Sequence, residues 1–211
     1  DFEQGELYLK DQAYSKAYKS YERYRESHPA SPNNKTLLMH LSYAYFQEND
    51  YVNTFQTADT FLRLYPHDRH ADYILFLKAM SQMIDHRSFL QKKFNINLAN
   101  LDVEHYHAAF YDFKDLLLTF PKSKYRKAAV YQLRHIRNIL ALHELNIGKF
   151  YFKKKAYIAS AKRAKNIIIQ FPGSPYLKES LTLLKDSYTF LGLDHSAAII
   201  QKLPIFKCHN I

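Results

Sequence analysis

The sequence predicts an all-α protein, an α-solenoid of about five stacked helix-turn-helix units. Composition favours this class, because only 4 of the 211 residues are Gly while 18 are Tyr and 15 are Phe. So few glycines leave little room for tight β-turns or phosphate-binding loops, and an apolar content of 47% is enough for a substantial core. A pattern repeated around four prolines then indicates the length of each unit.

The same residue types recur at fixed distances from Pro29, Pro66, Pro121 and Pro172. A tyrosine stands fifteen residues before each proline, a small residue twelve before, a large apolar residue five before, and a Ser or Asp two after. In that order the sets are Tyr14, Tyr51, Tyr106 and Tyr157; Ala17, Thr54, Ala109 and Ser160; Tyr24, Phe61, Leu116 and Ile167; and Ser31, Asp68, Ser123 and Ser174.

Each proline is expected to end a helix of about four turns, because proline lacks an amide and clashes with the preceding turn. The small residues would let a neighbouring helix approach, and the Ser and Asp residues would act as N-caps of the next helix. Between two such helices, residues 36–47 have apolar side chains at helical spacing. The 37 residues from Pro29 to Pro66 are close to the length of a tetratricopeptide repeat, so we predict repeats of this type.

The domain organisation follows from the places where the distance from one aligned proline to the next aligned tyrosine is longer than in the first repeat. Residues 87–101 are rich in apolar side chains without clean periodicity and are interpreted as an inserted loop packed on the solenoid. Residues 125–154 lack proline and contain one Gly, which predicts a long helix, and residues 176–191 and 194–203 predict a fifth, shortened pair. We therefore expect N-terminal repeats over 1–121, C-terminal repeats over 122–203 and a tail over 204–211.

Positive charge is concentrated in one segment. The net charge is +10, yet residues 122–165 hold thirteen of the 30 Lys and Arg and one of the 20 acids, Glu144. The segment therefore carries +12 and the rest of the chain −2. Such a surface attracts an acidic protein, anionic lipid or nucleic acid. We predict a protein-docking surface. A merely solvated face is the main alternative, and no recognised nucleic-acid motif accompanies the charge.

The motifs of common enzymes are absent: the sequence has no GxGxxG, P-loop, GxSxG or HExxH. We predict no enzyme activity and no cofactor. Residues 67–72 (HDRHAD) and 102–107 (DVEHYH) could be drawn as metal ligands, but acids at helix N-termini and surface histidines explain them better. Cys208 is expected to be an exposed thiol, with an intermolecular disulfide or a metal role as alternatives.

No apolar run of about 18 residues is present, so no membrane-spanning helix is expected. The chain starts at Asp1 rather than Met. It is therefore either a processed form or a piece of a longer chain, and a signal peptide or lipid-anchoring Cys would lie upstream.

Three stretches carry a family resemblance: residues 41–46 (LSYAYF), Asp72-Tyr73 with the apolar helix after it, and residues 108–125 (AAFYDFKDLLLTFPKSKY). Together with the insertion and the long helix they resemble the BamD family (ComL, YfiO), lipoproteins of the bacterial outer-membrane β-barrel assembly machinery. The resemblance covers nearly the whole chain. This chain departs from the family in being more basic, with Lys153-Lys154-Lys155 at a turn where a mixed turn with Gly is expected.

The resemblance implies a protein at the periplasmic face of the outer membrane, held by an N-terminal lipid that is not part of this chain. It implies that the C-terminal half binds the POTRA domains of the barrel-forming subunit, beside other lipoproteins of the complex. The N-terminal repeats would bind segments of unfolded outer-membrane proteins.

Arg163 matches a partner-contacting Arg of that family, nine residues before Pro172. The equivalent residues in the other repeats are polar, Ser20, Thr57 and Asp112, so this position is expected to face away from the core. The other candidate partner contacts in the basic segment are Lys154, Lys162, Arg134 and Arg137.

Three aromatic residues, Tyr43, Tyr73 and Phe76, are candidates for a peptide groove, where they would suit the Phe- and Tyr-rich C-terminal segments of barrel proteins. Packing between helices is their alternative role. The predicted function is a non-catalytic scaffold of the barrel-assembly complex, without a nucleic-acid partner. The alternatives are a tetratricopeptide adaptor of another envelope or cytosolic complex and an RNA-binding helical-repeat protein. RNA binding with a steep salt dependence would favour the latter.

Overall fold

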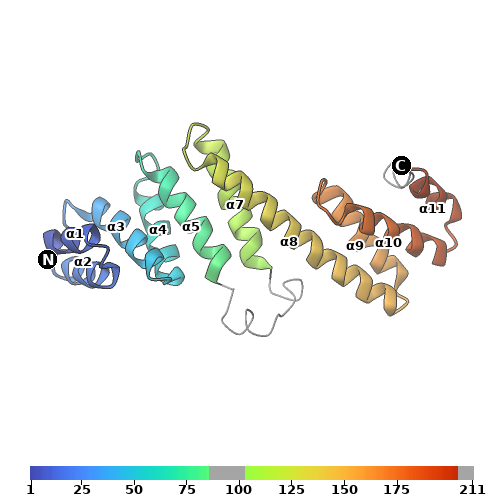
Figure 1. The fold of residues 1–211 in the computed structure, drawn as a ribbon, viewed down its shortest axis with the longest axis horizontal. Helices are drawn as coiled ribbons and strands as arrows, with labels where there is room; N and C mark the ends of the chain where they lie inside the picture. Colours follow the sequence, from blue (N-terminus) through green and yellow to red (C-terminus); the bar gives the residue numbers. More distant parts are fainter. Residues whose placement is uncertain (86–102, 204–211) are drawn as a thin grey trace. The chain divides into compact units, whose positions relative to one another are not determined.

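The computed structural model describes residues 1–85 and 103–203, and these two ranges contain ten α-helices and no strand (Figure 1). The fold is therefore all-α, as the sequence predicts. The predicted inserted loop at 87–101 and tail at 204–211 lie outside the described residues. In chain order the helices are α1 (Phe2–Lys10), α2 (Tyr14–Ser27), α3 (Asn34–Gln47), α4 (Tyr51–Leu64), α5 (Ala71–Asp85), α7 (Glu104–Thr119), α8 (Arg126–Lys153), α9 (Tyr157–Gln170), α10 (Leu177–Phe190) and α11 (Asp194–Gln201).

The described helices fall into two compact units. Residues 1–85 and 104–133 belong to the first and residues 134–203 to the second, so α8 begins in one and continues in the other. In the first unit α1 packs on α2, α3 on α4 and α5 on α7; in the second, α9 packs on α10 and α10 on α11. The assignment of substrate binding to 1–121 and partner docking to 122–203 remains a prediction.

The helix ends follow the prolines. Helices α2, α4, α7 and α9 each end two residues before one of the four aligned prolines. The predicted long helix is α8, with 28 residues, and the predicted fifth pair is α10 and α11. Proline lacks the amide that would continue the helix, and it also disfavours helical geometry in the residue before it.

The small residues of the repeat lie in the interior, as the prediction of close helix packing requires. All four, Ala17, Thr54, Ala109 and Ser160, are 0% exposed. Ser187 on α10 donates a hydrogen bond to Ser160 Oγ on α9 at 3.1 Å, so these two short side chains join the facing helices directly. The large residues five before proline are buried except Tyr24, whose hydroxyl lies 2.8 Å from Ser31 Oγ.

The predicted N-caps are misplaced. Ser31, Asp68, Ser123 and Ser174 each lie three residues before the first residue of the next helix, whereas a cap lies directly before it. They instead open a single turn that leads into the helix. Asp68 Oδ1 accepts from the His70 amide at 2.9 Å, and its carbonyl accepts from the Ala71 amide at 3.0 Å. This is the side-chain-to-backbone bonding typical of Asp and Ser in turns.

The turns within four hairpins share one backbone conformation. The residue two before the second helix has a positive φ, 60° at Lys155 and 71° at Gly192. Lys155 donates to the Phe152 carbonyl at 2.9 Å, and Ala156 donates to that of Tyr151 at 3.0 Å. This is the Schellman arrangement that closes a helix C-terminus. The four residues with this conformation are Gln12, Asn49, Lys155 and Gly192.

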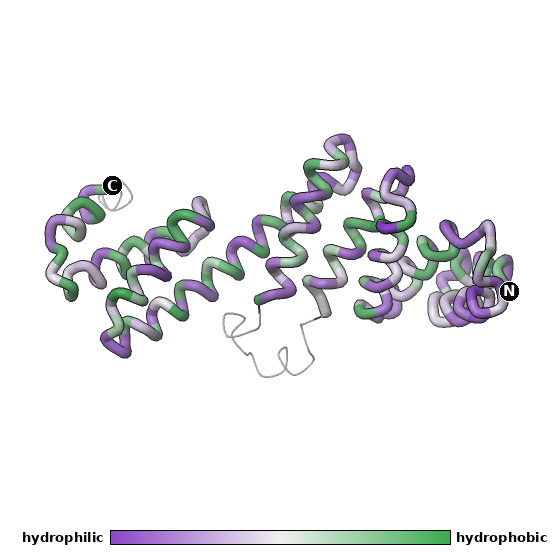
Figure 2. Tube along the Cα trace, turned by 180° about the vertical axis from the view of Figure 1, so that it is seen from behind, coloured by the Kyte–Doolittle hydropathy of each residue, from purple (hydrophilic) through white to green (hydrophobic). Residues whose placement is uncertain are grey.

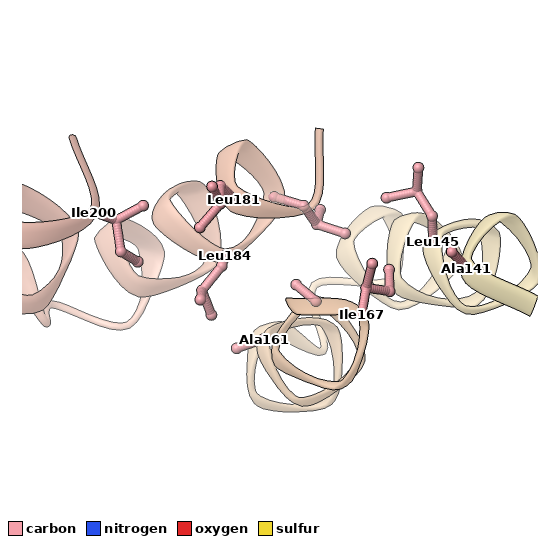
Figure 3. Packing of buried hydrophobic residues seen from close by; sticks show 9 residues of the cluster. Ala141, Leu145, Ala161, Ile167, Leu181, Leu184 and Ile200 are labelled. Carbon is pink, nitrogen blue, oxygen red and sulfur yellow. The ribbon is translucent and has the colours of Figure 1, made fainter. Parts of the chain in front are cut away.

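Apolar and polar residues alternate along the helices, as expected for helices buried on one side (Figure 2). In the second unit the core takes residues from α8, α9, α10 and α11 (Figure 3). This core holds α8 and α9 together as a hairpin, which positions the site described below. Its buried members are Ala141, Leu145, Ala161, Ala164, Ile167, Leu181, Leu183, Leu184 and Ile200.

The expectation that the position nine residues before each proline faces outward is wrong. Ser20 is 2% exposed and Thr57 6% exposed, and Asp112 is half-buried with its carboxylate 3.6 Å from Lys78 Nζ. A polar residue type does not imply exposure here, because the hydroxyl finds a partner near the helix. Ser20 Oγ, for example, donates to the Asp1 carbonyl at 3.0 Å.

Candidate functional site

Arg163, on α9, is engaged within its own chain. Its Nη1 lies 2.9 Å from Oε1 of Glu144 on α8. The Glu144 side chain is 15% exposed and that of Arg163 39% exposed, so this pair lies at the margin of the core and not free in solvent. Oε2 of Glu144 is buried and has no hydrogen-bond partner among the described residues. Arg163 is therefore bound to one oxygen of the Glu144 carboxylate, and the other oxygen has no hydrogen-bond partner among the described residues.

A cavity of about 630 Å³ opens beside this pair, lined by Tyr151, Lys162, Lys165 and Ile169 among others. Lys162, Lys165 and Ile169 are three and four residues apart and therefore lie on one side of α9. This side, the outer face of α9, borders the cavity. Ile158 is 75% exposed and Ile169 68% exposed, and between them Lys162 and Lys165 are also exposed. The surface combines cations with uncovered aliphatic side chains, a composition that suits a protein partner with acidic groups around an apolar centre.

The remaining predicted partner residues are spread along the hairpin. Arg137 donates to the Pro172 carbonyl at 3.4 Å, which ties α8 to the turn after α9, while Arg134 is exposed. Lys154 lies in the α8–α9 turn, 5.9 Å above the ring of Phe150. At 1.5 Å per residue, Arg137 and the end of α8 are about 24 Å apart. The five predicted residues thus mark a long surface and not a single point.

Gly148 allows the close packing of this hairpin, and the sequence pattern did not single it out. A Cβ at this position of α8 would lie 2.9 Å from Leu183 Cδ2 and 3.3 Å from Arg163 Cβ. A larger residue would force the Leu183 side chain, and to a smaller extent Arg163, to shift. The signal available in the sequence was that Gly148 is the only glycine in the long helix.

In the first unit, Tyr43 and Tyr73 line one pocket of about 570 Å³ between α3, α5 and the turn before α8. Tyr73 packs against Tyr125, with ring centroids 5.3 Å apart. Tyr43 meets Tyr14 edge-on at 5.6 Å, and their hydroxyls lie 3.4 Å apart. Two of the three predicted groove residues are therefore brought together, as the prediction requires.

Phe76 takes a packing role beside the pocket. Its ring stacks on Tyr125 at 5.2 Å and meets Phe113 edge-on at 5.8 Å. It supports Tyr125, which does line the pocket. Burial raises the pKa of the Tyr73 hydroxyl, so this ring stays neutral at ordinary pH.

The rim of this pocket is cationic. Arg69, Lys122 and Lys124 line it, and the acid among its lining residues is Asp72. Asp72 Oδ2 accepts from Ser123 Oγ at 2.6 Å, and Oδ1 accepts from the Tyr73 amide at 2.8 Å. Arg69, Lys122 and Lys124 form no ion pair within the described residues, so they can pair with an anionic group on a ligand.

In residues 67–72, one of the two segments that could be drawn as metal ligands, Asp68 is paired with side chains of the protein. Asp68 Oδ2 lies 2.8 Å from Lys35 Nζ, and Oδ1 lies 3.1 Å from His70 Nδ1. The hydrogen bond from Lys35 lowers the pKa of Asp68 to about 2, with further support from the His70 amide. Within residues 1–85 and 103–203 no group of three or more His, Cys, Asp or Glu side chains is placed to hold a metal ion.

Comparison with known proteins decides the family. A family model named YfiO, described as an outer membrane lipoprotein, matches residues 2–203. This chain belongs to the YfiO family. Members of the family with curated names agree. The outer membrane protein assembly factor BamD of Pasteurella multocida is 32% identical over 194 residues, 92% of this chain and 75% of that protein.

Two further YfiO-family relatives carry the same name, outer membrane protein assembly factor BamD. The one from Haemophilus influenzae is 29% identical over 96% of this chain and 77% of its own length. The one from Neisseria meningitidis is 30% identical over 92% of this chain and 73% of its own length. The resemblance read from the three sequence stretches is confirmed.

Among solved structures, a tetratricopeptide repeat protein from Parabacteroides merdae covers 94% of this chain and 75% of its own, with 16% identity and a TM-score of 0.35. The all-α assignment of this YfiO-family chain therefore rests on its own helices. In the described part of the chain, none of those helices has the length and apolar character needed to cross a bilayer.

Proposed function

We propose that this protein is a non-catalytic scaffold that assembles β-barrel proteins at the outer membrane. In this proposal the α8–α9 hairpin binds the periplasmic POTRA domains of the barrel-forming subunit. The pocket around Tyr43 and Tyr73 binds segments of unfolded barrel proteins. Family membership supports the process, and the geometry of the hairpin supports the mode of binding.

One observation carries the proposal: the outer face of α9 exposes Lys162 and Lys165 between two uncovered isoleucines, beside a cavity. Exposed isoleucines on a soluble surface favour burial against another protein. The lysines would orient an acidic partner and speed association more than they add affinity. Lys162 forms no ion pair within the described residues, so it is more accessible to a partner than Arg163.

The pocket of the first unit fits an extended peptide with aromatic side chains and a carboxylate. Three of its lining residues are tyrosines, Tyr43, Tyr73 and Tyr125, and their rings offer stacking surfaces to Phe and Tyr side chains. Arg69, Lys122 and Lys124 at the rim are placed for a peptide carboxylate.

A titration with the purified POTRA domains of the protein's own barrel-forming subunit tests the hairpin. Lys162→Glu should weaken binding about tenfold, because a reversed charge repels an acidic partner. Lys114→Glu is the matched control, since Lys114 is exposed on α7, outside the basic segment. Equal affinities of the Lys162→Glu and Lys114→Glu variants would remove the α9 face from the interface.

A peptide copied from the last strand of a barrel protein tests the pocket separately. Tyr43→Ala should lower peptide affinity about fivefold, since one stacking surface is lost. Tyr131→Ala is the control, because Tyr131 is 68% exposed and lies outside the pocket. Peptide binding that is insensitive to Tyr43→Ala would assign the tyrosines to packing alone.

A further inference from the structure

Two turns of the second unit lie side by side. Tyr157, the first residue of α9, stacks on Phe190, the last residue of α10, with ring centroids 4.7 Å apart and an interplanar angle of 12°. Phe152 meets Phe190 edge-on at 5.5 Å. The α8–α9 turn and the α10–α11 turn, both at ends of helices in Figure 1, therefore form one surface. Residues 150–157 and 190–195 are called the turn tip below.

The turn tip exposes large apolar side chains. Phe150 is 55% exposed, Phe190 62% and Leu193 48%. The aromatic stack holds Phe190 in place, so its exposure is built into the packing of the two turns. Keeping such side chains in water is unfavourable by about 25 cal/mol for each Å² of apolar surface. A surface that covers the turn tip would recover part of this free energy.

Three consecutive lysines accompany the exposed apolar residues. Lys153, Lys154 and Lys155 are all exposed, and none of them forms an ion pair within the part of the chain that the structure describes. Asp194 is the one acid of the turn tip, so its net charge is +2. The Lys154 ammonium lies 5.9 Å from the Phe150 ring centre, so a cation and an exposed aromatic ring are neighbours in the turn tip.

We propose that the turn tip binds the surface of an anionic lipid bilayer. The cations here are all lysines, point charges that suit a diffuse layer of phosphate headgroups; the planar fork that pairs arginine with a single carboxylate is missing from the turn tip. Aromatic rings beside them favour the headgroup level of a membrane. This lipid contact is separate from the partner contact that the proposed function places on the outer face of α9, and Lys154, predicted from the sequence as a partner contact, is here assigned to lipid.

Vesicle binding of the 211-residue chain, prepared without an attached lipid, tests this. The chain should co-sediment with vesicles of phosphatidylethanolamine and phosphatidylglycerol but not with vesicles of phosphatidylcholine alone. Neutralising the lysines with Lys153→Gln, Lys154→Gln and Lys155→Asn should weaken binding about 100-fold, at about a fivefold loss for each Lys near the surface. Asn is chosen at 155 because it tolerates positive φ. Phe150→Ser should add a further loss.

The control variant removes the same charge elsewhere, with Lys16→Gln, Lys19→Gln and Lys114→Gln, all at exposed positions. Far-ultraviolet circular dichroism checks that both triple variants are folded. Absence of binding to the anionic vesicles, or an equal loss in the control variant, would overturn the proposal. Unchanged vesicle binding together with weakened POTRA binding in the turn-tip variant would show a protein contact and overturn it as well.

Discussion

Replacing Arg163 by Met should lower the free energy of unfolding by about 2 kcal/mol, less than the roughly 3–5 kcal/mol for breaking a fully buried ion pair. The loss arises mainly at Glu144, whose side chain is 15% exposed and whose Oε2 has no partner in the described residues. Without Arg163, both carboxylate oxygens would be unsatisfied. The 39% exposure of Arg163 keeps the loss below that of a fully buried pair.

A double-mutant cycle isolates this pair. Glu144→Leu alone should cost about 1 kcal/mol, because Arg163 can turn toward water, and the double variant should cost no more than about 1 kcal/mol, since no unpaired carboxylate is left. The coupling energy is then about 2 kcal/mol. Urea unfolding followed by circular dichroism measures all four proteins. A coupling energy within error of zero would refute the ion pair as a structural contact.

The same cycle separates stability from binding. The double variant is expected to keep its fold and is therefore the right protein for titration with POTRA domains. Reversal of Arg163 to Glu is a poor test, because it places a second carboxylate beside Glu144 and would disturb the hairpin itself.

Three further results are expected. Ala109→Leu should destabilise the protein by about 1–3 kcal/mol, because Ala109 is 0% exposed, whereas Ala30→Leu in an exposed turn should not; equal urea midpoints would show that the alignment of the repeats is wrong. Lys155→Gly should stabilise the protein by about 0.5–1 kcal/mol, because it removes Cβ strain at positive φ, and Gly192→Ala should destabilise it comparably. Melting temperatures that change in the same direction in both variants would contradict this. Because the pKa of Asp68 is lowered to about 2, its stabilisation is present above pH of about 4 and is lost as pH falls towards 2. Asp68→Asn should remove that part of the acid sensitivity, and urea midpoints between these pH values measure it.

The fold could be predicted because its signals are local. Each proline acts on the helix directly before it, and the small residues repeat at one fixed spacing, so helix ends and close contacts follow from the chain alone. Ala109 and Ser160, at equivalent positions in two repeats, are both 0% exposed. The N-caps were misplaced because the Ser and Asp residues open a separate turn three residues before the helix, and residue type alone does not distinguish the two.

The candidate site depended on contacts between residues far apart in sequence. Arg163 and Glu144 are 19 residues apart and meet only because α8 and α9 pair in one register. Tyr125 follows Pro121 as an ordinary turn residue, yet its ring covers both Tyr73 and Phe76. Neither contact has a signature in spacing or composition, so the sequence could suggest candidate residues but not the partners that they contact.

Depletion of this protein from its native bacterium tests the central claim most directly. Quantitative mass spectrometry of outer-membrane fractions would follow β-barrel proteins and lipoproteins together. An assembly scaffold predicts that the barrel proteins fall while the outer-membrane lipoproteins hold their level, and that re-expression restores the barrels. Barrel proteins that keep their level after the protein is gone would contradict the account.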